Sequence, residues 1–77
     1  GDLKDYNMQV SIYGIIATQY PRHTKAPEAL YEMGYIYERR LDNPDKAIGI
    51  YRRIVKDYKG NSISAKAEER IKDLSNR

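Results

Sequence analysis

The sequence contains no cysteine, no tryptophan and no phenylalanine, and these absences exclude several kinds of core and site. Without cysteine there can be no disulfide framework, no thiolate nucleophile and no zinc site built from thiolates. Any aromatic core must be built from the eight tyrosines. No apolar run approaches the roughly 20 residues that span a bilayer, and the N-terminus lacks the charged start and apolar block of a signal peptide. We therefore expect no membrane span.

Motifs that carry catalysis or bind cofactors are also missing. The sequence has no Gly-x-Gly loop, no Gly-x-Ser-x-Gly turn and no pair of histidines. His23 is the only histidine and lies in a predicted loop. An exposed residue without a functional role is therefore favoured over a metal ligand or general base. Glu28 and Glu32 lie one turn apart, but a carboxylate metal site between helices needs ligands from other helices that are not available. We expect no enzyme activity, no cofactor and no metal.

The length and charge of the chain limit what it can be. A chain of 77 residues makes one small domain, which buries only about 60% of its unfolded surface. The net charge of +3 is modest beside the basic stripe of a nucleic-acid-binding protein, so no specific nucleic acid is expected. Basic residues gather on one predicted helix, as Arg52, Arg53, Lys56 and Lys59. A solvated outer face is the favoured interpretation of this cluster, and contact with phosphate or anionic lipid is the alternative.

Apolar residues recur at steps of three and four in four stretches of the chain, which is the period of an amphipathic helix. The predicted helices span residues 3–20, 26–41, 44–58 and 62–75. Because the links between them are short, consecutive helices should be antiparallel neighbours. No stretch alternates with a period of two for long enough to indicate a strand. The sequence therefore predicts an all-α array of two antiparallel helix pairs.

Polar and small residues mark the predicted ends and close contacts of these helices. The expected N-caps are Asp2, Thr24, Asn43 and Ser62. Gly60 can end the third helix in the left-handed conformation. Gly34, in the middle of the second helix, costs up to about 1 kcal/mol relative to alanine, so its expected use is to let a neighbouring helix approach. Glu68 and Lys72 have the spacing of an ion pair on the last helix.

The chain repeats itself. A shift of 38 residues places Tyr13 on Tyr51, and the same shift places Tyr20 on Tyr58. Such a period is typical of stacked helix pairs. Large, small and aromatic residues follow a fixed order across the second and third helices: Leu30, Met33, Gly34, Tyr37, Ala47, Tyr51 and Ile54. In this order the chain resembles the tetratricopeptide repeat.

The link that follows Tyr20 resembles that of one variant of this repeat. Tyr20-Pro21 with Thr24 and Ala29 is similar to the Tyr-Pro-x-Ser-x-x-Ala link of a variant found in bacterial envelope proteins, such as the Tol-Pal system-associated periplasmic protein and the outer-membrane barrel-assembly lipoprotein. The resemblance divides the single domain of residues 1–77 into three parts. They are the second helix of a preceding repeat (3–20), a complete repeat (26–58) and a C-terminal capping helix (62–75). A periplasmic or cell-envelope location rests on this resemblance alone.

The resemblance also implies a binding surface. In tetratricopeptide proteins the exposed face of each first helix lines a concave groove that receives peptides. In this sequence that face carries Glu28, Tyr31, Tyr35, Glu38 and Arg39. Alternatively, the two tyrosines pack on the first or fourth helix, or stack under Arg39 as a cation–π pair.

Three functions follow from these features. The favoured one is a non-catalytic scaffold that binds a peptide or protein through the concave face. The alternative is a structural assembly module, in which the first helix pairs with its equivalent in a second copy through an apolar surface widened by Met8, Ile12 and Ile15. A third is an electrostatic tether to anionic surfaces through the third helix.

Overall fold

Four α-helices joined by short links make up the fold. The computed structural model describes residues 3–76, and within them the helices are α1 (Leu3–Gln19), α2 (Ala26–Arg39), α3 (Pro44–Asp57) and α4 (Ser62–Ser75). No strand occurs in this part of the chain. The all-α prediction is confirmed, and three of the four helices end one or two residues before their predicted ends. The N-cap predicted at Asp2 lies outside the described residues.

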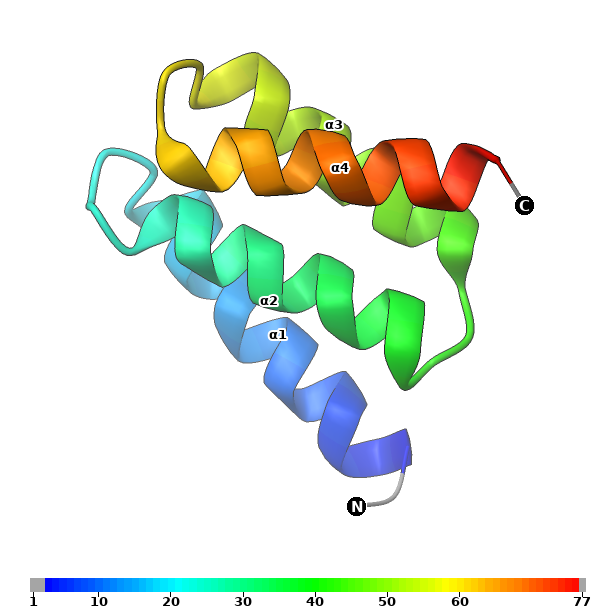
Figure 1. The fold of residues 1–77 in the computed structure, drawn as a ribbon. Coiled ribbons are helices and arrows are strands. Elements are labelled where there is room, and N and C mark those ends of the chain that lie inside the picture. Colours follow the sequence, from blue (N-terminus) through cyan, green and yellow to red (C-terminus); the bar gives the residue numbers. More distant parts are fainter. Residues whose placement is uncertain (1–2, 77) are drawn as a thin grey trace.

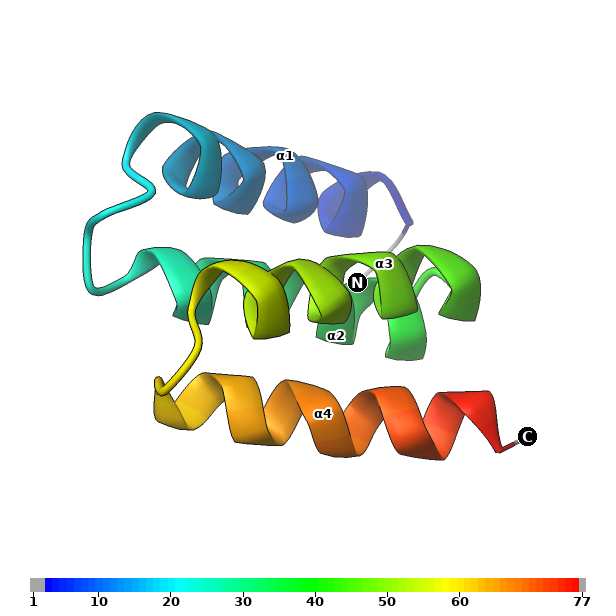
Figure 2. The same ribbon diagram turned by 90° about the horizontal axis from the view of Figure 1, so that it is seen from above.

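Each helix runs antiparallel to the one before it and packs against it (Figure 1). Helix α2 also contacts α4, and in both views α2 lies between α1 and α4 (Figure 2). Helix α3 packs on α2 and α4, whereas α1 packs on α2 alone. The result is a slab measuring 34 × 32 × 14 Å. One long side of α1 therefore has no helix beside it in the described part of the chain.

The core lies where α2, α3 and α4 meet. Its three largest fully buried side chains are Leu30, Tyr51 and Ile54, and Ala17 of α1 closes it on one side. Ala47 and Ala67 allow the helix backbones to approach closely, because their methyl side chains are small. Gly34 is buried directly against the Tyr51 ring, which confirms the predicted close approach. Tyr51 is thus the central aromatic residue of a core that has no phenylalanine, and its buried hydroxyl needs a hydrogen-bond partner.

Side chains at the helix ends explain why the helices begin where they do. The Asn43 side chain accepts a hydrogen bond from the Lys46 amide, which confirms this N-cap. The prediction of Ser62 as N-cap is wrong by one residue, because the Asn61 side chain accepts from the Ile63 amide at 2.9 Å. Gly60 precedes it with φ of +85°, the left-handed conformation that glycine adopts at low cost.

The link between α1 and α2 is closed differently from the prediction. Thr24 does not cap α2; the N-cap position is Lys25, which has no side-chain capping bond. The ring of His23 accepts a hydrogen bond from the Lys25 amide instead, at 3.0 Å from Nδ1. The Tyr58 hydroxyl donates to the carbonyl of Pro21 at 2.7 Å, so the end of α3 holds this link in place. Pro27 in the first turn of α2 needs no amide partner there.

Candidate functional site

A groove bordered by α1, α2 and α4 is the first candidate binding surface. It has a volume of about 550 Å³ and lies beside the N-terminal halves of α2 and α4. The apolar part of its lining comes from all three helices: Tyr13 and Ile16 of α1, Ala29 and Tyr31 of α2, and Ile63 of α4. The charged part consists of Lys25, Glu28, Glu32 and Lys66. The charged residues are exposed and the apolar ones are at least half-buried, so charges of both signs surround an apolar floor.

Tyr31 joins this groove to the core. Its ring lies 5.5 Å from the ring of Tyr51, tilted by 49°, which is a favourable aromatic arrangement. Burial raises the pKa of the Tyr31 hydroxyl, and the nearby carboxylate of Glu38 acts in the same direction. The hydroxyl therefore remains protonated at neutral pH and can donate a hydrogen bond. Half-buried by the core on one side, the ring still lines the groove on the other.

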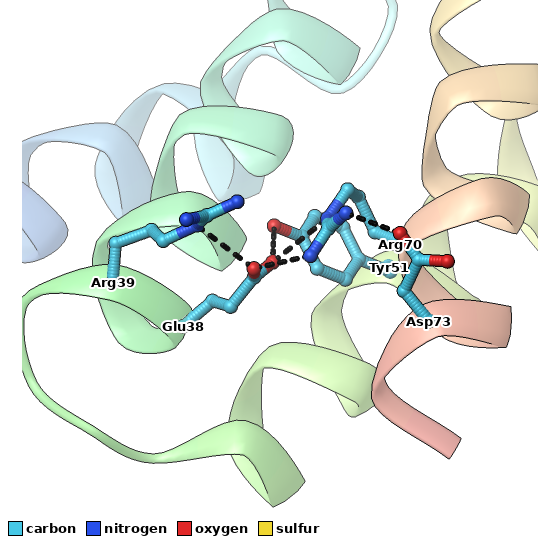
Figure 3. Close-up of polar contacts among 5 residues, drawn as sticks. All are labelled: Glu38, Arg39, Tyr51, Arg70 and Asp73. Atoms are coloured by element: carbon cyan, nitrogen blue, oxygen red, sulfur yellow. Dashed lines mark hydrogen bonds and ion pairs between the residues drawn. The ribbon is translucent and has the colours of Figure 1, made fainter. Parts of the chain in front are cut away.

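Glu38 holds α2, α3 and α4 together rather than facing solvent (Figure 3). Its side chain is 1% exposed. Oε1 accepts from the Tyr51 hydroxyl at 3.0 Å and from Nε of Arg70 at 3.0 Å, while Oε2 accepts from Nη2 of Arg70 and lies 3.0 Å from Nε of Arg39. Arg70 also donates from Nη1 to Asp73 at 2.7 Å. Among the described residues no buried side-chain nitrogen or oxygen lacks a hydrogen-bond partner.

The charges of this cluster are stable at neutral pH. Burial by itself would raise the pKa of Glu38, but the hydrogen bonds from Arg70 and Tyr51 and the charges of Arg70 and Arg39 outweigh it and lower that pKa. The pKa of Tyr51 is raised by burial and by the neighbouring carboxylate, so the hydroxyl stays a donor. The hydrogen bonds from Arg70 to Glu38 raise the pKa of the guanidinium. The network therefore consists of a carboxylate, a phenol and a cation, each with its partners.

Tyr35 and Arg39 lie further along α2 and form an exposed pair. The guanidinium carbon of Arg39 is 5.6 Å from the centroid of the Tyr35 ring, within the range of a cation–π interaction. The Tyr35 side chain is exposed. Glu28, near the start of the same helix, pairs with Lys25 at 3.3 Å. The alternative interpretation, stacking with Arg39, thus holds for Tyr35, whose side chain is still exposed to solvent.

The structure divides the five residues predicted for the binding surface into three groups. Glu28 and Tyr31 line the groove, and Tyr35 and Arg39 continue its α2 side as an exposed pair. Glu38 is buried in the ion-pair cluster, so it can position its neighbours but has no free oxygen to offer a partner. The residues that sequence reasoning missed are Tyr13, Ile16, Lys25, Glu32, Ile63 and Lys66 of the groove, and Arg70 beneath Glu38.

A second apolar surface runs along α1. Met8, Ile12 and Ile15 are 59%, 53% and 54% exposed and follow one another at helical spacing. The buried residues of α1 are Val10 and Ala17, on the opposite side of the helix. The exposed side is therefore the one that faces away from α2.

Metal-binding and membrane-spanning features are absent from the described residues. Among residues 3–76 there is no group of three or more histidine, cysteine or carboxylate side chains that could hold a metal ion. The only histidine, His23, is exposed and uses its Nδ1 within the α1–α2 link. No helix in the described range is long and apolar enough to cross a membrane.

Comparison with known proteins gives a match to the region of α2 and α3. Residues 28–61 match the family model described as tetratricopeptide repeat. The match supports this family. It begins in the first turn of α2, contains α3 whole and ends at the N-cap of α4, so the matched region covers most of the α2–α3 hairpin. Repeats of this kind generally mediate protein–protein interaction. No curated protein and no solved structure was found to match the chain.

Proposed function

We propose that this protein is a non-catalytic interaction scaffold that binds a peptide segment of a protein partner in the groove between α1, α2 and α4. The observation that carries the proposal is the groove itself, in which Tyr13, Ile16, Tyr31 and Ile63 converge from three helices on one space of about 550 Å³. The tetratricopeptide match of the α2–α3 pair is consistent with this role.

The lining of the groove indicates the chemistry of the partner. An aliphatic or aromatic side chain can enter between Tyr31 and Ile63, where it removes apolar surface from water at about 25 cal/mol per Å². Tyrosines suit such a surface because each ring offers a large rigid area together with a hydroxyl. Glu32 and Lys66 on the rim can orient charged groups of either sign. The exposed pair of Tyr35 and Arg39 extends the surface along α2.

The buried cluster around Glu38 supports the proposal by making the groove rigid. Glu38 connects α2 to α3 through Tyr51 and to α4 through Arg70, and the groove is formed partly by α2 and α4. A groove whose walls are held before binding loses less entropy when a peptide binds. The cluster thus positions the walls of the groove. The proposed contact surface includes Glu28, Tyr31, Tyr35 and Arg39.

Peptide selection tests this proposal with no assumption about the sequence of the partner. Twelve-residue peptides selected from a random display library on the wild-type protein would be measured by calorimetry against Lys66→Ala and Tyr35→Ala. We expect either substitution to weaken binding by roughly tenfold, the effect of losing one well-placed interface contact. Tyr20→Ala removes another exposed tyrosine that lies outside the groove, and it should bind as the wild type does. Equal losses in all three variants would overturn the proposal.

A second candidate function is self-assembly through α1, and the apolar face of Met8, Ile12 and Ile15 favours it. The internal repeat sharpens this observation. The shift of 38 residues places Met8 on Lys46, Ile12 on Ile50 and Ile15 on Arg53, so at two of these three positions α1 carries an apolar side chain where α3 carries an exposed cation. A second copy that pairs through the same face would cover it.

Light scattering over a concentration range tests self-assembly directly. The wild type should form dimers or larger species as the concentration rises, and Ile12→Lys should remain a monomer because the lysine places a charge at the centre of the apolar face. A wild type that stays monomeric at all concentrations would rule this function out.

The cellular location follows only from the link around Tyr20-Pro21, which is similar to that of envelope variants of the repeat. A periplasmic or envelope location is accordingly a further part of the proposal. Fractionation of cells that produce the full-length protein would test it, and recovery in the cytoplasmic fraction alone would contradict it.

A further inference from the structure

A second groove lies between α3 and α4, on a different part of the surface from the first. Its volume is about 420 Å³, and it shares no lining residue with the groove between α1, α2 and α4. Val55 of α3 and Ile71 of α4 are the apolar members of its lining, and both are half-buried. The rest of the lining is charged: Arg52, Lys56, Lys59, Glu68 and Lys72.

The charges around this groove are strongly unbalanced. Four cations and one carboxylate surround the apolar floor, and all five side chains belong to exposed residues. Arg52, Lys56 and Lys59 follow one another at steps of four and three along α3 and its end, while Lys72 stands across the groove on α4.

The cations of this groove are available to a partner. The ion pair predicted between Glu68 and Lys72 is absent from the described part of the chain, and none of the four cations has an ion-pair partner there. Arg53, by contrast, stands outside the groove and pairs with Asp57 at 3.8 Å. The basic cluster on α3 is therefore more than a uniformly solvated face, because part of it borders an apolar floor and is joined by a cation from α4.

We propose that the α3–α4 groove is a second docking site, which binds an acidic peptide segment carrying an aliphatic side chain. The aliphatic side chain would lie on Val55 and Ile71, and carboxylates on either side of it would approach Lys56, Lys59 and Lys72. An anionic partner also relieves the mutual repulsion of these neighbouring cations. Charge complementarity would therefore select the partner, and apolar contact with Val55 and Ile71 would add to its affinity.

The position of the apolar residues favours a peptide over a membrane surface. A protein that inserts into a bilayer needs large apolar side chains that protrude beyond its cations. The exposed large apolar side chains of this protein are Leu3, Met8, Ile12, Ile15, Tyr20 and Tyr35, and none of them borders the α3–α4 groove. Val55 and Ile71 are recessed between the charged side chains, where a single peptide side chain reaches them and a flat bilayer does not.

The test uses a fluorescein-labelled peptide of sequence EELEELEE, a neutral analogue with glutamine in place of each glutamate, and an analogue with alanine in place of each leucine. Fluorescence anisotropy with the wild-type protein should show binding of the first peptide and at least roughly tenfold weaker binding of each analogue. Binding of the first peptide should also weaken as salt is added, because exposed charges are screened. Equal binding of the neutral analogue would overturn the proposal.

Two double variants with the same net charge separate the groove from a general attraction. Lys56→Gln with Lys72→Gln, and Lys46→Gln with Arg53→Gln, each lower the net charge from +3 to +1, since two cations are removed in both cases. Circular dichroism would check that both are folded. We expect the first to bind the acidic peptide roughly tenfold more weakly and the second to bind within about twofold of the wild type.

Three further outcomes would contradict the docking site. Equal losses in the two double variants would mean that the whole positive surface attracts the peptide without a specific site. Loss of binding in Tyr35→Ala would place the acidic peptide on the contact surface of the first proposal, which Tyr35 extends along α2. Binding to vesicles of anionic phospholipid without binding to the peptide would show a membrane-attachment surface instead.

Discussion

Gly34 of α2 and Tyr51 of α3 are matched in shape, because the ring of Tyr51 occupies the space that a side chain at position 34 would need. A Cβ atom at Gly34 would lie 2.6 Å from Cε1 and 2.9 Å from Cζ of that ring. Tyr51 cannot retreat easily, since it is fully buried and its hydroxyl is bonded to Glu38. This contact limits how closely α2 and α3 approach each other, and the Tyr51 hydroxyl reaches Glu38 of α2.

Gly34→Ala should therefore destabilise the protein although alanine is the better helix former. The gain in helix propensity is about 1 kcal/mol, and overpacking at a closed site costs about 1–3 kcal/mol, to which displacement of the Tyr51 hydroxyl adds. A lower melting temperature is expected. Gly49→Ala is the matched control, because Gly49 lies in α3 with no atom within 4 Å of an added Cβ. That variant should be as stable as the wild type or more stable, and a more stable Gly34→Ala would show that the ring is free to move.

Removal of Arg70 should be among the most damaging single changes. Arg70→Met leaves the Glu38 carboxylate buried without its bidentate partner, which costs about 3–5 kcal/mol for a fully buried pair and somewhat less here because the Arg70 side chain is 18% exposed. Chemical denaturation measures this loss. The double variant Glu38→Gln with Arg70→Met should be less damaged than the sum of its single variants, since no buried charge remains. Strict additivity would mean that the two side chains do not act as a pair.

The acid stability of the protein should depend on Glu38. Its pKa is lower in the folded protein than in the unfolded chain, where a glutamate titrates near about 4.3. Unfolding therefore takes up a proton below that value, so the stabilisation is complete above about pH 4.3 and is lost as the pH falls towards the folded pKa. Denaturation curves at several pH values should show a steeper loss in the wild type than in Glu38→Gln. Glu32→Gln removes the same charge from the exposed side of α2 and should keep the wild-type slope, because Glu38 is still in place.

The N-cap of α4 can be tested by exchanging two neighbouring residues separately. Asn61→Ala removes the side chain that accepts from the Ile63 amide, which should cost about 1 kcal/mol in the free energy of unfolding. Ser62→Ala removes a hydroxyl for which the structure gives no capping role and should be nearly neutral. A larger loss of stability in Ser62→Ala than in Asn61→Ala would show that Ser62 is the N-cap, as the sequence predicts.

The sequence was sufficient to predict the architecture because hydrophobic periodicity and turn residues agree in each segment. Four helices, the Asn43 cap and the close approach at Gly34 are all confirmed. Both wrong caps, Thr24 and Ser62, share one cause. The links before α2 and α4 close through local bonds of His23 and Asn61, and the sequence alone does not show which of several adjacent polar residues forms such a bond.

The candidate site was less predictable because it depends on which residues of different helices meet. Helical periodicity placed Glu38 on the same broad face as Tyr31 and Tyr35, yet its carboxylate points to Tyr51 and Arg70. One signal was present. Because the sequence predicts an aromatic core built from tyrosines, each buried hydroxyl needs a partner, and a carboxylate on an adjoining helix is such a partner. The contribution of Ile63 and Lys66 from α4 to the groove could be recognised only after α4 was placed beside α2.

The most direct test of the proposed function maps where a selected peptide contacts the protein. Backbone amide shifts of ¹⁵N-labelled protein would be recorded during titration with the tightest peptide from the display selection. The proposal predicts that the largest changes fall on the groove, at Tyr13, Ile16, Glu32, Ile63 and Lys66. Changes confined to the Met8, Ile12 and Ile15 face of α1, or to the groove between α3 and α4, would contradict it.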